Sequence, residues 1–393
     1  MYALAAYRIV PSVLGEAQLP VSIITIAAAL VAAFVSPQHR RAILVVASGV
    51  AAWFAFAWWA LALAGFVATI AVLGRTRLPI YAKLALAFLA WLAIPLARLY
   101  WLDVDEQVDT ILLSIIWAGQ LYSAFYVLVE REREPVETRP SVLADVFYLT
   151  AIPRIALPFF QPISPRLIAQ RERAPFPRRL IWNGLGLGAL GTAFAACAWL
   201  FHYPIRYLDH HHLHWLAIVV EYLEFYARVT YTIFLAIAAF RLLGFELPSG
   251  YRRPFLSRSF AEFFRRFNHY VRDAVLSLFY FPLLGHLRHH ARPRIASIAS
   301  AYLAILVGSF ALHDLLIPLS TTIEPLSIVD YFLDPVRVGS MFLLWTLIIL
   351  PNAGIAPKKP PPISRWRMAA QIALFNVVYF ALWYASRVGR GKG

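Results

Sequence analysis

The feature that most constrains this chain is a run of 33 residues, Ala42–Gly74, that contains no charged side chain. A membrane-spanning helix needs about 20 apolar residues, so the run is too long for one span and long enough for two. We therefore divide it near Trp58-Trp59. Similar apolar runs recur along the chain, and no polar stretch between them is long enough for a soluble domain. The sequence predicts an all-α, polytopic integral membrane protein.

Ten runs are predicted to cross the membrane. They are Leu19–Val35, the two halves of Ala42–Gly74, Ile80–Trp101, Ile111–Val129, Leu180–Phe201, Trp215–Phe245, Ile295–Leu319, Val336–Leu350 and Met368–Ser386. We expect a single membrane domain over residues 1–393, with N-terminal spans in 1–140, a core in 141–320 and C-terminal spans in 321–393. Re-entrant or interfacial helices complete this predicted helical bundle.

The charge of the chain fits a membrane protein better than a nucleic-acid-binding protein. Only 15% of the residues are charged, whereas an ordinary soluble domain has about 25%. The formal net charge is +15, but the arginines lie in short loops between apolar runs, as the positive-inside rule predicts for cytoplasmic loops. We expect contact with membrane lipids and no nucleic-acid partner.

Basic and acidic loops alternate along the predicted spans, which gives an orientation. The basic loops, expected in the cytoplasm, are residues 38–41, 75–77, 166–179, 252–294 and 358–367. The acidic loops, expected outside, are residues 103–109 and 324–334. Ten spans would place both termini outside, whereas the basic tail at 387–392 favours a cytoplasmic C-terminus. The number of spans and the side of the C-terminus therefore stay open.

One cytoplasmic segment, Ser257–Leu284, has the pattern of an amphipathic helix at the membrane interface. Its apolar face is formed by Phe260, Phe263, Phe264, Phe267 and Val271. His269 falls on the opposite, polar face, where we expect it to face water or lipid headgroups. Ser259 and Glu262 have the spacing of a capping box at the helix start. Two interpretations are open, a surface helix without chemistry and part of an active site.

Ionisable residues also occur inside the predicted spans. Glu224 and Arg228 have the i, i+4 spacing of a favourable helical ion pair, with Glu221 on the same face. Charges inside a span usually face a bundle interior or an aqueous cavity. A structural ion pair and a tunnel-lining role explain this pair equally well. His313 lies in an apolar run and is a functional candidate by the same rule. The alternative interpretation is a buried structural histidine whose hydrogen bonds are all made.

Two histidine clusters have spacings found in metal sites. His210-x-x-x-His214 and His286-x-x-His289-His290 match the spacings of membrane di-iron desaturases and hydroxylases. The predicted topology places the two clusters on opposite sides of the membrane, too far apart for one metal pair. We therefore predict that neither cluster belongs to a metal site.

A glycine-rich stretch lies at the start of the predicted span Leu180–Phe201. Its glycines are Gly184, Gly186, Gly188 and Gly191. A phosphate-binding glycine loop follows a strand, and no strand is predicted before this stretch. Small residues at this spacing instead predict close packing between membrane helices.

Four segments follow one another in a characteristic order. They are Tyr148–Ile163 (YLTAIPRIALPFFQPI), Arg241–Phe245 (RLLGF), Glu262–Leu283 (EFFRRFN, then RD and YFPL) and Gly308–His313 (GSFALH). In this order they resemble the membrane-bound O-acyltransferase family, and within it the bacterial alginate O-acetylase and D-alanyl-transfer branch. The resemblance covers about Leu143–Leu319, nearly half of the chain. It implies a multi-pass protein of a bacterial inner membrane.

The resemblance implies an acyltransferase that moves an acyl group from a thioester to a hydroxyl of a glycan, lipid or protein. His313 would be the general base. Asn268 would position the acceptor or donate a hydrogen bond to the developing oxyanion. The co-substrate would be acyl-CoA or an acyl-carrier thioester from the cytoplasmic side, with no bound cofactor and no metal.

The remaining residues assigned to substrate binding are charged. Arg265, Arg266 and Arg272 could hold the phosphates of acyl-CoA or anchor the chain on anionic lipid, and Glu224 and Arg228 could line the path of the substrate. A partner protein for export or acceptor delivery is also compatible with this branch. Two other classes stay open, a di-iron desaturase or hydroxylase and a non-catalytic transporter or lipid-binding relative.

Overall fold

The computed structural model describes the greater part of the chain between residues 34 and 307, and a C-terminal helix. The described residues are 24, 27–28, 31–32, 34–56, 59–101, 107–135, 140–150, 163–173, 177–211, 213–259, 262–263, 266, 269–307 and 364–388. They form helices and turns, with one isolated antiparallel bridge, Glu172–Phe245, and no strand among them. The predicted all-α fold is confirmed for this part of the chain.

The described residues divide into two compact units. The first takes those of Met1–Gly188 and Ala236–Pro248, and the second takes those of Ala189–Leu235, Ser249–Ala311 and Leu326–Gly393. The predicted division at residues 140 and 320 is not tested by this clustering and stays a prediction.

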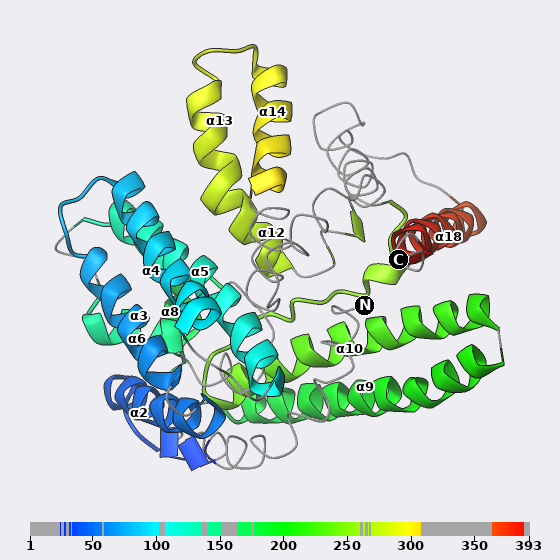
Figure 1. Ribbon diagram of the computed structural model, residues 1–393, viewed down its shortest axis with the longest axis horizontal. Helices are drawn as coiled ribbons and strands as arrows, with labels where there is room; N and C mark the ends of the chain where they lie inside the picture. Colours follow the sequence, from blue (N-terminus) through cyan, green and yellow to red (C-terminus); the bar gives the residue numbers. More distant parts are fainter. Residues whose placement is uncertain are drawn as a thin grey trace. The chain divides into compact units, whose positions relative to one another are not determined.

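The first unit is built from helices (Figure 1). They are α2 (Pro37–Phe56), α3 (Trp59–Leu73), α4 (Ile80–Trp101), α5 (Gln107–Arg133), α6 (Val142–Thr150) and α8 (Pro165–Arg171). Of these, α2, α3, α4 and α5 overlap the early apolar runs. Helix α2 ends at Phe56 and α3 begins at Trp59, on either side of the point where the long apolar run was divided. Helix α2 packs on α6, and α4 packs on α5. Leu44, Ile70 and Leu121 are fully buried in this unit.

Two long antiparallel helices, α9 (Arg178–His210) and α10 (His214–Leu242), form a hairpin (Figure 1). A Cβ atom at Gly184 would lie 3.1 Å from the Leu242 side chain, and one at Gly191 would lie 3.0 Å from the Leu235 side chain. Gly188 faces Ala238 of α10 at 3.7 Å. The predicted packing role is confirmed for these three glycines and wrong for Gly186, where an added Cβ atom would meet no neighbouring atom within 4 Å.

The Leu-Leu-Gly-Phe segment stops helix α10. Gly244 adopts the left-handed conformation with φ 94°. The N–H of Phe245 donates to the carbonyl of Phe240 at 2.9 Å, and the N–H of Gly244 donates to that of Arg241 at 3.0 Å. These two bonds define a Schellman motif, which commonly includes a contact between its first and last apolar residues. The rings of Phe240 and Phe245 make this contact edge-to-face, with centroids 6.1 Å apart.

The second unit contains a helix with a widened turn. Helices α12 (His269–Val275), η3 (Leu276–Tyr280) and α13 (Phe281–Leu287) follow one another without a break, and η3 is a π-helix. Pro282 has no N–H to bond to the carbonyl of Leu278, so the α-helical ladder is interrupted here. The N–H of Phe281 instead donates to the carbonyl of Leu276, five residues earlier.

Three further elements complete the described part of this unit. Helix α14 (Pro293–Ile305) forms a second hairpin with α13 (Figure 1). The short helix η2 (Pro254–Leu256) contacts α18 (Arg365–Val388). The Asn376 amide of α18 donates to the carbonyl of Phe255 at 2.9 Å, which attaches the C-terminal helix to the second unit.

Within the described residues, one helix is long and apolar enough to cross a membrane. It is Arg178–Ile205 in α9, with a mean hydropathy of 1.6. Shorter apolar helices are Ala60–Leu73, Ile80–Ala93 and Ile233–Leu242. In α10, the charged residues Glu221, Glu224 and Arg228 shorten the apolar part of the predicted span. The predicted span Val336–Leu350 lies outside the described residues, as do most of Leu19–Val35 and the second half of Ile295–Leu319.

Candidate functional site

The residues proposed for the active site are only partly described. His313, Asn268 and Arg265 lie outside the described residues, and so does the side chain of Arg228, whose backbone belongs to α10. The side chains of Arg266, Arg272 and Glu224 are described. Glu224 is half-buried on α10. The predicted pairing of Glu224 with Arg228 therefore stays a prediction.

The carboxylate of Glu262 organises the arginines that precede α12. Glu262 is only 7% exposed. Its Oε1 accepts from Nη2 of Arg266 at 2.7 Å, and its Oε2 accepts from Nε of Arg258 at 3.2 Å and from the backbone N–H of Arg258 at 2.9 Å. Burial favours the neutral acid, but these hydrogen bonds and the arginine charges prevail and hold the pKa of Glu262 below its ordinary value. The carboxylate therefore stays charged, and Arg266 is paired with it.

The predicted capping box is present in an altered form. The Ser259 hydroxyl accepts from the N–H of Glu262 at 3.2 Å, as a capping box requires. The Glu262 carboxylate, however, accepts from the N–H of Arg258 instead of that of Ser259. The bond shifts by one residue because the same carboxylate also binds the Arg258 guanidinium.

Arg272 is paired with its neighbour in sequence. Its Nη2 and Nε donate to Oδ1 of Asp273 at 2.7 and 2.9 Å. Both described arginines of the proposed donor site, Arg266 and Arg272, are thus already bound to a carboxylate. A phosphate at either one would compete with that carboxylate.

His269, predicted to face water or lipid headgroups, keeps only part of its side chain exposed. It is half-buried at the start of α12, with its ring 4.1 Å from the ring of Tyr270. Its backbone N–H donates to the carbonyl of Gly250 at 3.4 Å, which brings residues 249–251 against this end of the helix. Burial lowers the pKa of the His269 imidazole below its ordinary value, although the charge of Asp273 opposes the shift. Neutral imidazole is therefore favoured at this position.

The apolar side of the same segment packs into a cluster of aromatic rings. Phe263 is 1% exposed, and its ring lies 4.8 Å from that of Tyr379 in α18. Phe255 of η2 lies edge-to-face on Tyr226 of α10 with centroids 4.2 Å apart. The predicted apolar face is confirmed at Phe263, while Phe260, Phe264 and Phe267 lie outside the described residues.

Two of the four motif segments adjoin π-helical turns. The Tyr280-Phe281-Pro282-Leu283 segment begins on the last residue of η3. Leu306 and Val307, which precede Gly308–His313, are π-helical as well. Such turns are rare and occur frequently at functional sites, because they displace the following side chains from the regular helical register.

Sequence reasoning missed a buried ion network in the first unit. Asp145 of α6 is fully buried; its Oδ1 accepts from Nη2 of Arg131 at 2.5 Å and its Oδ2 from Nη1 of Arg75 at 3.0 Å. Arg131, 4% exposed, also binds Glu134. The sequence signal was a single acid in the otherwise apolar start of Val142–Phe160. Two arginines on one fully buried acid indicate a structural role in joining α5, α6 and the turn that follows α3.

The histidine clusters occupy the ends of two different hairpins. His210 ends α9, and His286–His290 lies at the end of α13 and in the turn that follows. In the part of the chain that the structure describes, no group of three or more His, Cys, Asp or Glu side chains is placed to hold a metal ion. The prediction of no metal site stays a prediction.

No protein-family model matches this chain, and no curated protein matches it. The likeness to the O-acyltransferases therefore depends on the four ordered motif segments alone.

Proposed function

We propose that this chain is a multi-pass bacterial inner-membrane protein of about ten spans that transfers an acyl group from a thioester to a hydroxyl. The observation that carries the proposal is the order of the four motif segments over residues 143–319. Acyl-CoA or an acyl-carrier thioester is the donor, from the cytoplasmic side. The acceptor is a hydroxyl of a glycan, lipid or protein.

The surface of α9 supports the membrane part of the proposal. Only 17% of its most apolar window is buried, whereas the core helix of a soluble protein is mostly covered. Large apolar side chains remain open, including Trp182 at 72% and Trp199 at 58% exposure. Contiguous apolar surface of this extent needs a covering, and hydrocarbon of the lipid bilayer supplies one.

The proposed reaction uses the imidazole of His313 as general base. The neutral imidazole takes the proton of the acceptor hydroxyl while the oxygen attacks the thioester carbonyl carbon. The tetrahedral intermediate then collapses with cleavage of the carbon–sulfur bond, and the imidazolium returns its proton to the leaving thiolate. The products are an ester and a free thiol. The atoms and electrons of the reaction therefore balance without a metal or a redox cofactor.

Asn268 is proposed as the hydrogen-bond donor to the oxyanion of that intermediate. Loss of one such donor typically slows catalysis by about 10²–10³. Support for a donor-binding role of the neighbouring arginines is weaker, because Arg266 and Arg272 are paired with Glu262 and Asp273. A thioester donor with a phosphate-bearing carrier would bind them by displacing these carboxylates.

The test uses the full chain purified in neutral detergent, with acetyl-CoA and palmitoyl-CoA as donors and a bacterial membrane extract as acceptor. We expect acceptor-dependent release of free thiol from one of the two donors. His313→Ala should abolish release while leaving the amount of folded protein unchanged, and Asn268→Ala should reduce it about 10²-fold or more. His39→Ala is the matched control, because His39 is exposed and bonded locally to Ser36. Full activity of His313→Ala would refute the mechanism.

A further inference from the structure

The turn that joins α13 to α14 concentrates positive charge. Residues 286–294 read HLRHHARPR, with three arginines, three histidines and no acid. Arg288, Arg292 and Arg294 are exposed, and none of them makes an ion pair with another described residue. Arg266 and Arg272 of the same unit, by contrast, are each neutralised by a carboxylate. The α13–α14 turn therefore presents unneutralised cationic charge.

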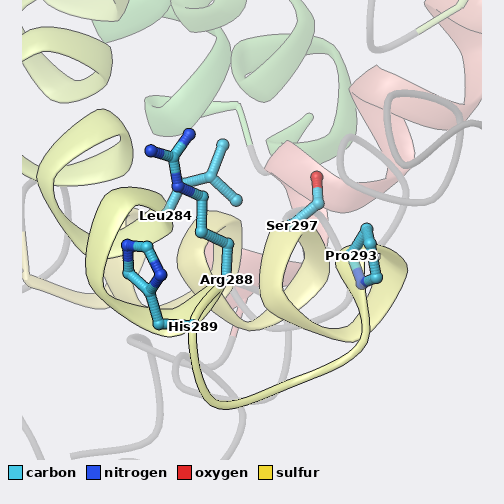
Figure 2. Close-up of a pocket in the computed structure, with 5 residues that line it drawn as sticks. All are labelled: Leu284, Arg288, His289, Pro293 and Ser297. Carbon is cyan, nitrogen blue, oxygen red and sulfur yellow. The ribbon is translucent and has the colours of Figure 1, made fainter.

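A cavity of about 540 Å³ opens at this turn, between the end of α13 and the start of α14. It is lined by Leu284, Arg288, His289, Pro293 and Ser297. Figure 2 shows the Arg288 guanidinium beside Leu284, the His289 imidazole on one side of it, and the Ser297 hydroxyl on the neighbouring helix. Residues that carry a guanidinium, an imidazole and a hydroxyl thus line the same cavity.

The hydroxyl of this cavity is held in place. Ser297 Oγ lies 3.1 Å from the hydroxyl of Tyr280, the last residue of the π-helical turn η3. Arg288 contributes a planar guanidinium, which matches the oxygens of a phosphate in a bidentate manner. The first turn of the 13-residue helix α14 adds further partial positive charge, since no side chain caps it. This set of groups suits a phosphate.

Exposed apolar side chains occur on both helices of this hairpin. Phe281, at the start of α13, and Ile295, in the first turn of α14 beside the basic turn, are each 56% exposed, and Leu284 lines the cavity itself. A cationic cavity with apolar side chains on the same hairpin matches a ligand with a phosphate next to hydrocarbon. The turn also belongs to the basic loop 252–294, which is expected at the cytoplasmic face, where anionic lipids attract basic segments. These features favour a phospholipid over a free phosphate ion.

We propose that the cavity at the α13–α14 turn binds the phosphate of an anionic phospholipid headgroup through Arg288, with Arg292 adding charge and Ser297 a hydroxyl donor. The proposal rests on the membrane location proposed above and not on acyl transfer. The α13–α14 hairpin would then anchor the protein to anionic lipids, independently of catalysis.

The experiment measures lipid binding by the full chain in neutral detergent, with native mass spectrometry as the readout. The probes are dihexanoyl-phosphatidylglycerol, dihexanoyl-phosphatidylcholine and inorganic phosphate. We expect phosphatidylglycerol to bind at least tenfold more tightly than either of the others. The double variant Arg288→Gln/Arg292→Gln should lose at least tenfold in affinity for phosphatidylglycerol. Arg288→Lys/Arg292→Lys should lose less, because the charge remains and only the bidentate geometry is removed.

The matched control is Arg365→Gln/Arg367→Gln, which makes the same change in net charge at exposed positions of α18. It should bind phosphatidylglycerol as the wild type does. Equal losses in the two glutamine variants would overturn the proposal in favour of a response to net charge. Equal affinity for inorganic phosphate and phosphatidylglycerol would overturn the choice of a lipid.

The outcomes separate this proposal from the proposed function. Lipid binding that survives in His313→Ala, or in a protein with no thioester turnover, would leave the lipid site standing while the acyltransferase proposal fails. Thioester turnover without any preference for phosphatidylglycerol would leave the acyltransferase proposal standing and overturn the lipid site. Thermal unfolding of each variant checks that the fold is retained, and we expect no change because the substituted arginines are exposed.

Discussion

The hydroxyl groups of Tyr280 and Ser297 lie 3.1 Å apart, and they are the point at which the π-helical turn η3 is bonded to α14. Pro282 interrupts the regular helix, and the resulting π-helical turn sets the direction in which the Tyr280 side chain leaves the helix. The Tyr280 hydroxyl in turn contacts the Ser297 hydroxyl on α14.

Tyr280→Phe should weaken the α13–α14 hairpin by about 1 kcal/mol, the typical net value of one hydrogen bond. Hydrogen exchange by mass spectrometry should show faster exchange in residues 293–305 and no change in α9. Tyr207→Phe is the control, because Tyr207 is 63% exposed on α9. Unchanged exchange in α14 would show that the hydroxyl contact does not stabilise the hairpin.

Gly191→Ala should be less stable than Gly186→Ala, although both replace a glycine in α9. Alanine is favoured over glycine in a helix by about 1 kcal/mol, so the exposed Gly186→Ala should gain stability. At Gly191 the new Cβ would lie 3.0 Å from Leu235 and 3.3 Å from its backbone nitrogen, which offsets the gain. Thermal unfolding in detergent measures the difference, and equal melting temperatures would contradict the close approach of α9 and α10.

Replacing Asp145 or Arg131 singly should be strongly destabilising, because each leaves a buried charge without its partner, at a cost of about 3–5 kcal/mol. The double variant Asp145→Leu/Arg131→Met should cost less than the sum of Asp145→Leu and Arg131→Met. In the double variant, the Arg75 side chain, which is already 34% exposed, can orient toward water. Chemical denaturation of the four proteins gives the coupling energy, and strict additivity would mean that the two residues act independently.

The stability of the wild type should fall with acidification more steeply than that of His269→Gln. Burial lowers the pKa of His269 in the folded protein below its unfolded value of about 6.5. The unfolded chain therefore binds the proton first, and folded-state stability is lost as pH falls below about 6.5. Melting temperatures between pH 8 and pH 5 measure the difference. Parallel curves for the two proteins would show that His269 is solvated.

Much of the helical architecture follows from apolar runs and local signals. Helix α4 has the limits predicted from the sequence, and the long run divides as expected. Buried charges were less predictable, because their partners are distant in sequence. Arg40, expected in an exposed basic loop, is 2% exposed and donates to the carbonyl of Arg173 at 3.0 Å. Lys83, within a predicted span, is likewise buried and bonds to Glu132.

The candidate site was predictable to a smaller extent. Helical periodicity placed Phe263 on the buried face correctly, but it could not predict that His269 is half-buried, because the carbonyl of Gly250 accepts from the His269 N–H and this loop packs against the start of α12. A period of 3.6 residues describes one helix in isolation and carries no information on a later or earlier loop that packs against it. The pairing of Arg266 with Glu262, at i and i+4, was within reach of the same reasoning.

The bridge at the base of the α9–α10 hairpin has a consequence for the order of folding. The N–H of Arg173 donates to the carbonyl of Gly244 at 3.0 Å, and the N–H of Glu246 donates to that of Arg171 at 2.8 Å. Joining these positions through a flexible loop of about 70 residues would carry a large entropic cost. Antiparallel pairing of α9 with α10 brings the two ends together first, so the remaining closure is short. The bridge can therefore form during synthesis once Leu247 has emerged from the ribosome, before the residues of α12, α14 and α18 have emerged.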